Sequence, residues 1–198
     1  GEFKVFGLAT YQRDKGKPVI ETATFSVKDP TAPYVIRIQN SGRNGEFSPA
    51  SSAKIWLNDE LVVSPGDFRQ KIAFIEMPVG LKGSNTLQVE VRGKEGSGFT
   101  LEIIGDDRVP PLVSITAPVN GLKTKETIIK VSGTASDATT SVVSVTVNGQ
   151  PATIIGETFE AQVTSSEGPN TITALAGHRC RGKSGTGIYN CHQGYHTT

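Results

Sequence analysis

The sequence predicts an all-β protein built from two tandem antiparallel β-sandwiches. Apolar and polar residues alternate with a period of two along most of the chain, whereas helical periodicity is nearly absent. Clusters of Gly, Pro, Asn and Asp interrupt this alternation about every 8 to 12 residues, which is the spacing typical of sandwich folds. A polar segment that ends in two prolines, residues 105–111, divides the 198 residues into two parts.

The first predicted domain covers residues 1–105. Its clearest strand has Phe99, Leu101 and Ile103 alternating with polar residues, so one face can be buried while the other meets water. The same pattern predicts strands at 3–11, 18–27, 33–39, 52–57, 60–63, 68–76, 84–92 and 97–104.

A short connector, residues 106–111, follows the first domain. Pro110 and Pro111 stiffen it, because proline fixes φ and cannot donate to a strand ladder. The second domain covers residues 112–198 and has an atypical tail from residue 177 onward. Its predicted strands are 112–117, 126–135, 142–148, 151–155, 157–163 and 170–176.

An internal echo supports two related sandwiches. Residues 55–59 read Ile-Trp-Leu-Asn-Asp, and residues 145–149 read Val-Thr-Val-Asn-Gly. Asn and Gly favour tight hairpins because they tolerate positive φ. In both halves a Gly-x-Asn-Thr element follows, at 83–86 and 168–171, where we expect the Asn to bond to local backbone.

Several stretches of the second half carry a family resemblance. Residues 110–118 read Pro-Pro-Leu-Val-Ser-Ile-Thr-Ala-Pro, 131–137 read Val-Ser-Gly-Thr-Ala-Ser-Asp, 145–150 read Val-Thr-Val-Asn-Gly-Gln, and 167–174 read Glu-Gly-Pro-Asn-Thr-Ile-Thr-Ala. Together they resemble bacterial Ig-like domains of the type named after the B domain of glucodextranase, over residues 110–176. The resemblance implies non-catalytic modules of secreted or cell-surface bacterial proteins, with no shared ligand. Residues 1–105 loosely resemble jelly-roll or Ig-like accessory domains of bacterial surface proteins.

All the histidines and cysteines lie in residues 178–198: His178, His192, His196, Cys180 and Cys191. Imidazoles and thiolates are zinc ligands, but this spacing fits no familiar zinc module. Cys180 and Cys191-His192 form only a stretched version of the c-type haem motif C-x-x-C-H. A structural disulfide between Cys180 and Cys191 suits an oxidising compartment. The zinc, haem and disulfide interpretations of the tail stay open at this point.

The tail also departs from the family pattern, which continues as Ala-Thr-Asp-Ala-Ala-Gly and a last strand. Residues 177–182 read Gly-His-Arg-Cys-Arg-Gly. Codons that permit this hexapeptide, GGC-CAC-CGA-TGC-CGC-GGG, read Ala-Thr-Asp-Ala-Ala-Gly one nucleotide later. We therefore hypothesise that residues 177–198 follow a frameshift, and we expect them to lack the last strand. The encoding DNA tests this hypothesis.

The composition excludes several classes of function. Residues 1–176 contain neither His nor Cys, so they cannot supply a histidine-activated nucleophile, and we predict no enzyme activity. A net charge of +1 favours neither global disorder nor a dedicated nucleic-acid binder. The chain has no apolar run of about 18 residues that would predict a membrane span.

Two ligand hypotheses rest on residues in the body of the chain. Trp56 is out of phase with its apolar neighbours and so faces outward; with Tyr34 and Tyr11 it is a candidate for stacking on sugar rings. Asp106, Asp107 and Asp137 supply oxygen ligands for Ca²⁺ if the connector folds against the second domain. Otherwise these groups are turn and surface residues, and the chain has no cofactor.

The sequence therefore predicts a non-catalytic structural or adhesion-type module pair of a larger bacterial protein. We expect an extracellular or cell-surface location, with the periplasm as an alternative. The expected partners are other domains of the same protein, and further a polysaccharide or a surface protein, but no nucleic acid or membrane. The alternative function is a carbohydrate-binding accessory module of a secreted glycosidase. The lesser alternative is a metal- or haem-binding segment that uses the Cys and His residues of the tail.

Overall fold

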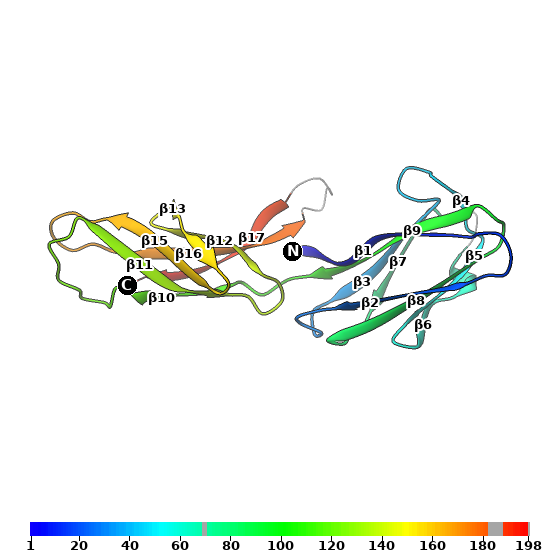
Figure 1. Cartoon of the computed structure of the whole chain (residues 1–198), viewed down its shortest axis with the longest axis horizontal. Coiled ribbons are helices and arrows are strands. Elements are labelled where there is room, and N and C mark those ends of the chain that lie inside the picture. The colour runs from blue at the N-terminus through cyan, green and yellow to red at the C-terminus, as the bar shows by residue number, and fades with distance from the viewer. Residues whose placement is uncertain (69–70, 182–187, 198) are drawn as a thin grey trace. The chain divides into compact units, whose positions relative to one another are not determined.

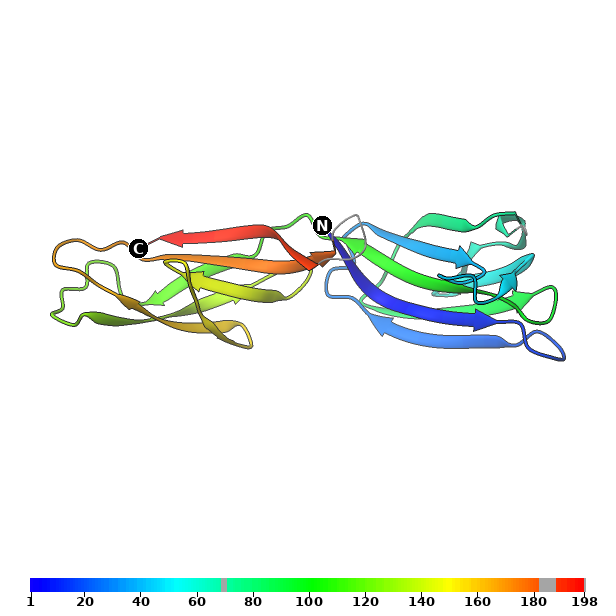
Figure 2. The ribbon, with the colours of Figure 1, turned by 90° about the horizontal axis from the view of Figure 1, so that it is seen from above.

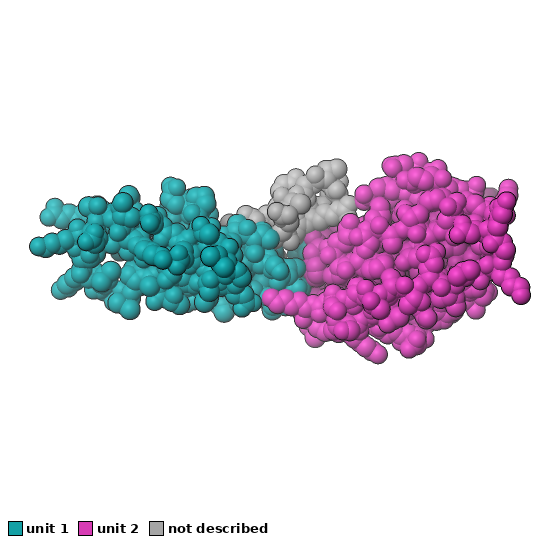
Figure 3. Space-filling view, viewed as in Figure 1, with its two compact units in different colours: residues 1, 107–198 teal, residues 2–106 magenta. Residues whose placement is uncertain are grey.

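The chain divides into two compact units (Figure 3). The computed structural model describes residues 1–68, 71–181 and 188–197, and for 179–181 and 188–197 it describes the backbone alone. The first unit is Glu2–Asp106; the second is Asp107–Thr198 together with Gly1. The predicted all-β class is confirmed. Within the described ranges, no helix is long and apolar enough to cross a membrane.

The first unit consists of two sheets (Figure 1). One sheet has the order β1 (Glu2–Gln12), β9 (Ser97–Asp106), β3 (Tyr34–Asn40) and β7 (Phe74–Val79), with β4 (Ser48–Pro49) added in parallel to β9. The other has the order β2 (Ile20–Ser26), β8 (Ser84–Arg92), β5 (Ser52–Leu57) and β6 (Glu60–Val63). A 3-10 turn, η1 (Pro65–Asp67), follows β6.

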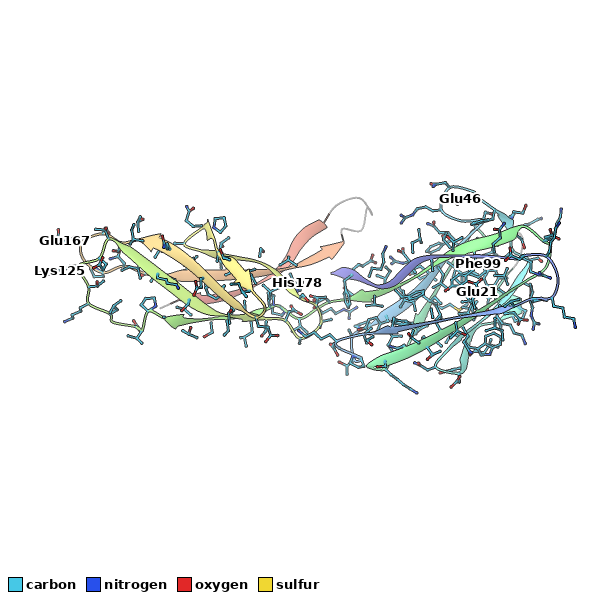
Figure 4. All side chains as sticks on the ribbon, viewed as in Figure 1. Glu21, Glu46, Phe99, Lys125, Glu167 and His178 are labelled. Atoms are coloured by element: carbon cyan, nitrogen blue, oxygen red, sulfur yellow. The ribbon has the colours of Figure 1, made fainter. Side chains whose placement is uncertain are left out.

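Alternating apolar side chains from these two sheets form the core of the first unit. Ile36 on β3 and Leu87 on β8 are fully buried, and Phe99 on β9 lies among them (Figure 4). The Phe99 ring packs against the rings of Phe68 and Tyr11, with centroids 5.1 and 5.8 Å away. Each large apolar side chain buried in this way stabilises the fold by about 1.5–3 kcal/mol.

The second unit also consists of two sheets, and Figure 2 shows its strands in two layers. One has the order β10 (Leu112–Ala117), β11 (Ile128–Ser136), β15 (Thr158–Thr164) and β14 (Thr153–Ile155). The other has the order β13 (Gln150–Pro151), β12 (Val142–Val147), β16 (Thr173–Arg181) and β17 (Ile188–Thr197). The core of the second unit includes the buried side chains of Val131, Val147 and Phe159. Gly133 is required there, because a Cβ would collide with the Ser114 carbonyl and the Phe159 ring.

The last strand differs from the prediction. We expected the tail to lack it, but β17 pairs with β16 from Thr173 opposite Thr197 to Arg181 opposite Ile188. The prediction is wrong because the edge of β16 offers backbone N–H and C=O groups with which another strand can pair. Such backbone pairing depends only weakly on which side chains the added strand carries. The reading frame of the tail is a separate question, which the encoding DNA tests.

Two strands begin later than the alternation of apolar and polar residues predicts, because side chains hold the preceding residues in turns. β7 begins at Phe74 and not at residue 68, since Ser64 and Asp67 cap each other around η1, with the Ser64 amide donating to Asp67 over 2.8 Å. β16 begins at Thr173 and not at residue 170, because the Asn170 side chain holds the preceding turn.

The internal echo is present in the structure. Asn58 and Asn148 have positive φ of 52° and 47° at the two hairpins. In each case Oδ1 accepts a backbone N–H from the neighbouring chain segment, that of Thr86 at 3.0 Å and that of Thr173 at 2.8 Å. The Asn of each Gly-x-Asn-Thr element bonds local backbone as predicted, Asn85 to Lys82 and Asn170 to Ser166.

Candidate functional site

A buried cluster of two carboxylates and one imidazole lies in the second unit. Asp107 and His178 are 0% exposed and Asp137 is 4% exposed. Asp107 lies just beyond β9, Asp137 directly follows β11, and His178 is on β16, where Figure 4 labels it. Potential ligand atoms of all three side chains lie within 4.8 Å of one another. We call these three residues the Asp–Asp–His cluster.

The imidazole bridges the two acids through one nitrogen. Nδ1 of His178 lies 2.7 Å from Oδ2 of Asp137 and 3.1 Å from Oδ2 of Asp107. Because an ionised carboxylate can only accept hydrogen bonds, Nδ1 carries the proton and donates to Asp137, while Oδ2 of Asp107 lies at ion-pair distance. The Thr140 hydroxyl also donates to Oδ2 of Asp107, over 2.8 Å.

Backbone amides fix the other oxygen of each carboxylate. Oδ1 of Asp107 accepts the Val109 N–H over 3.0 Å. Oδ1 of Asp137 accepts the amides of Thr139 and Thr140, each over 2.8 Å. These are local Asx-type bonds, which Asp forms readily after a strand. They orient both carboxylates so that their Oδ2 atoms converge on the imidazole.

The cluster keeps Asp137 ionised. Burial alone raises the pKa of Asp137, but hydrogen bonds from His178 and from the Thr140 and Thr139 amides lower it by more. The pKa therefore lies below the usual range for an aspartate. Two acids facing one Nδ1 create a site that favours a positive charge. Since all three side chains are buried, the cluster is suited to holding a cation and not to meeting a large substrate.

The structure brings together a different set of potential metal ligands from either set that the sequence predicted. Of the proposed calcium set, Asp107 and Asp137 come together, but Asp106 ends β9 and is not part of the cluster that the described residues form. The third member is His178, which the sequence analysis grouped with the tail. The side chains of the other tail candidates, and with them the predicted disulfide and the haem motif, lie outside the described residues: Cys180, Cys191, His192 and His196.

One sequence signal could have placed His178 in the fold. Ala174 and Ala176 are buried on the inner face of β16, at 0% and 1% exposure, and His178 continues the same period of two. The convergence of Asp107 and Asp137 has no such local signal, because it depends on how separate segments of the second unit pack.

Trp56 presents a second candidate surface, in the first unit. Its neighbours Ile55 and Leu57 point into the core, so its half-buried ring lies on the outer face of the sheet β2–β8–β5–β6. Gln88 is directly opposite on β8. The Lys54 ammonium lies 5.7 Å from the centre of the indole ring, a cation–π distance.

The other two predicted sugar-stacking rings are not on the surface. Tyr34 is 3% exposed and donates its hydroxyl to the Asp29 carbonyl over 2.5 Å. Tyr11 is 5% exposed, and its burial, with a smaller effect of the Glu21 charge, raises its pKa to about 12. Both side chains occupy strand positions that face the core, so neither offers a ring face to a sugar. Of the three predicted rings, Trp56 alone faces outward.

An open hollow of about 1050 Å³ occurs at a loop end of the second unit. It lies between residues 118–127 and 165–170, whose Lys125 and Glu167 are labelled in Figure 4. Ile129 and Ile172 contribute apolar surface, and its rim carries both lysine and glutamate. Its described lining includes no aromatic ring, so it lacks the flat ring surface that Trp56 offers.

The fold defines a pair of β-sandwich modules. Comparison with known proteins finds a family to which the second module is similar. Residues 111–188 match the family "Glucodextranase, domain B", which confirms the predicted resemblance. No curated protein matches the chain. A crystal structure of the GH2 beta-galacturonidase from Eisenbergiella tayi bound to galacturonate matches with 10% identity and a TM-score of 0.29, over 90% of this chain and 34% of that one. The chain thus spans about a third of that enzyme's length.

Proposed function

We propose that the chain is a non-catalytic accessory segment of a larger bacterial protein that is secreted or displayed on the cell surface. The match of residues 111–188 to domain B of glucodextranase, a non-catalytic accessory domain, carries this proposal. The burial of the Asp–Asp–His cluster supports it, because groups that are 0–4% exposed cannot reach a polymeric substrate.

The mechanism of such a segment is spatial. Each sandwich is held by its own core, centred on Phe99 in the first unit and on Phe159 in the second, and so behaves as a stiff body. Pro110 and Pro111 restrict the backbone near the start of the second unit. The segment spaces and presents neighbouring domains of the same protein, which are its proposed partners.

Deletion from the parent protein tests this role. Removing residues 1–198 is expected to leave turnover of a small soluble substrate by the parent protein unchanged and to reduce its action on, or attachment to, an insoluble polymer. The purified chain is expected to hydrolyse none of a panel of polysaccharides. Turnover by the purified chain that Asp137→Asn abolishes would contradict the proposal.

A second function, recognition of a polysaccharide, is favoured by the Trp56 face. An indole lying on an outer sheet face offers a flat apolar surface for the C–H face of a sugar ring. Gln88 opposite it and Lys54 over the ring supply donors, and Gln88 also an acceptor, for hydroxyl groups. The Trp56 face therefore combines the two chemistries that a sugar needs.

The sole tryptophan makes this binding directly measurable by fluorescence. Titration with soluble polysaccharides is expected to shift Trp56 emission, and affinity electrophoresis is expected to show retardation. Trp56→Ala should weaken binding at least about tenfold, as loss of a central aromatic contact does. The matched control is Phe74→Ala, which removes a 50% exposed ring from β7 of the opposite sheet and should leave binding unchanged. Equal losses in both variants would contradict this function.

A further inference from the structure

Two of the three side chains of the Asp–Asp–His cluster are acids. Two aspartates carry two negative charges, and the one imidazole that faces both of their Oδ2 atoms carries at most one positive charge. All three side chains are buried, and a net charge away from water is costly unless a counter-charge meets it. A divalent cation at the point where the three ligand atoms converge would offset the two negative charges of the aspartates.

We propose that Asp107, Asp137 and His178 bind a divalent transition-metal ion of the zinc type. The ligand atoms are Oδ2 of each aspartate and Nδ1 of the histidine. The ion takes the place of the Nδ1 proton, which is released to solvent, and a neutral imidazole then ligates the metal. This site goes beyond the accessory role proposed above, and it does not depend on the Trp56 face.

The donor set selects the class of metal. Calcium prefers six to eight oxygen ligands, whereas this cluster offers imidazole nitrogen together with two carboxylates. Nitrogen and oxygen donors in small number suit zinc and its first-row neighbours. The calcium site expected from Asp106, Asp107 and Asp137 is therefore replaced by a zinc-type site that includes His178.

The two Nδ1–Oδ2 distances are compatible with that ion after a small expansion. Zinc ligands lie about 2.0–2.2 Å from the metal, so two ligand atoms in a tetrahedral site are about 3.3 Å apart. The two Nδ1–Oδ2 separations are 2.7 and 3.1 Å. Each needs to widen by only a few tenths of an ångström, as expected when a metal replaces a hydrogen bond.

The surroundings already resemble the outer shell of a metal site. Amides of Val109, Thr139 and Thr140 hold the outer oxygens of the two carboxylates, and the Thr140 hydroxyl donates to Oδ2 of Asp107. Such bonds orient metal ligands and strengthen binding. Because the ligands are enclosed, we expect the ion to enter as the second unit folds, which couples binding to stability.

The experiment uses the full chain, freed of metal with a chelator, unfolded, and refolded with or without Zn²⁺. We expect about one zinc per chain by elemental analysis and a saturable rise of the thermal midpoint. Asp137→Asn and His178→Ala should abolish both. Glu157→Gln, which changes an exposed carboxylate of the same unit, should change neither.

Two further variants separate this cluster from the tail and from simple misfolding. The quadruple variant Cys180→Ser, Cys191→Ser, His192→Asn, His196→Asn should keep the zinc-dependent rise. Thr140→Val keeps all three ligands, removes the hydroxyl donor to Asp107, and should weaken zinc binding by about 10- to 100-fold.

Cobalt substitution in the wild-type chain gives a direct reading of ligand type. Bound Co²⁺ should show d–d bands of a nitrogen- and oxygen-ligated ion, without thiolate-to-metal charge transfer. The absence of a zinc-dependent rise, its survival in Asp137→Asn, its loss in the quadruple tail variant, or a thiolate band would each overturn the proposal.

Discussion

One buried polar site in each unit illustrates two different ways of burying polar atoms. In the first unit, Asn40 is 5% exposed and neutral: its amide nitrogen donates to the carbonyls of Ala50 and Ile72, each over 3.0 Å, and its oxygen accepts the Ala50 N–H over 2.8 Å. In the second unit, the buried polar groups of the Asp–Asp–His cluster carry charge.

The difference shows what each kind of burial requires. A neutral amide needs only nearby backbone partners, so its contribution to stability does not depend on solution conditions. A buried ionic cluster needs several chain segments in place and a counter-charge between the acids. In the first unit the ion pairs of Arg37 with Glu2 and Glu76 are partly exposed instead, so water screens their charges.

The largest expected effect comes from breaking the buried cluster. Asp137→Ala breaks the buried pair with His178 Nδ1 and removes the carboxylate oxygen that accepts the Thr139 and Thr140 amides. We expect a loss of about 3–5 kcal/mol in the free energy of unfolding, measured by urea denaturation of the metal-free chain. Glu157→Gln serves as the exposed control, with a change near zero. Similar values for the two variants would contradict the ionic description of the cluster.

A smaller loss is expected from the neutral counterpart. Asn40→Ala leaves the Ala50 N–H and the Ala50 and Ile72 carbonyls without their side-chain partner. The expected cost is about 2 kcal/mol, the range for buried groups that lose a hydrogen bond. Because no charge is involved, denaturation at pH 4 and at pH 7 should give the same difference from wild type. A pH-dependent difference would contradict the contrast between the units.

The smallest expected effect is acid sensitivity of the second unit. The pKa of Asp137 is lowered in the folded chain, so its stabilising effect is fully present above the ordinary aspartate pKa, about 4, and is lost as pH falls through the lowered value. Asp137→Asn should therefore show a shallower decline of the thermal midpoint below pH 4 than wild type. Parallel curves for the two proteins would show that Asp137 does not cause the decline.

Most of the fold could be predicted from the sequence, because period-two alternation reports which strand faces are buried. The strands at 52–57, 60–63, 84–92 and 112–117 agree with the structure at both ends. The predicted strand boundaries were wrong where side chains form hydrogen bonds with the backbone, as at Ser64–Asp67 and at Asn170. These bonds compete with the backbone hydrogen bonds between strands.

The candidate sites were predicted less completely. Trp56 was placed outward by its phase, but Tyr11 and Tyr34 were not recognised as core residues, because tyrosine suits both buried and exposed positions. Asp107 and Asp137 were named as ligands, yet their true neighbour was missed. His178 enters the site only because β16 extends to Arg181 in place of ending at residue 176.

Anomalous diffraction at the zinc absorption edge, from crystals of the full chain refolded with one equivalent of Zn²⁺, tests the charge balance of this cluster most directly. The account predicts one anomalous peak within bonding distance of Oδ2 of Asp107, Oδ2 of Asp137 and Nδ1 of His178. A peak at the cysteines of the tail, or none at the cluster with His178 Nδ1 still donating to Asp137, would contradict it.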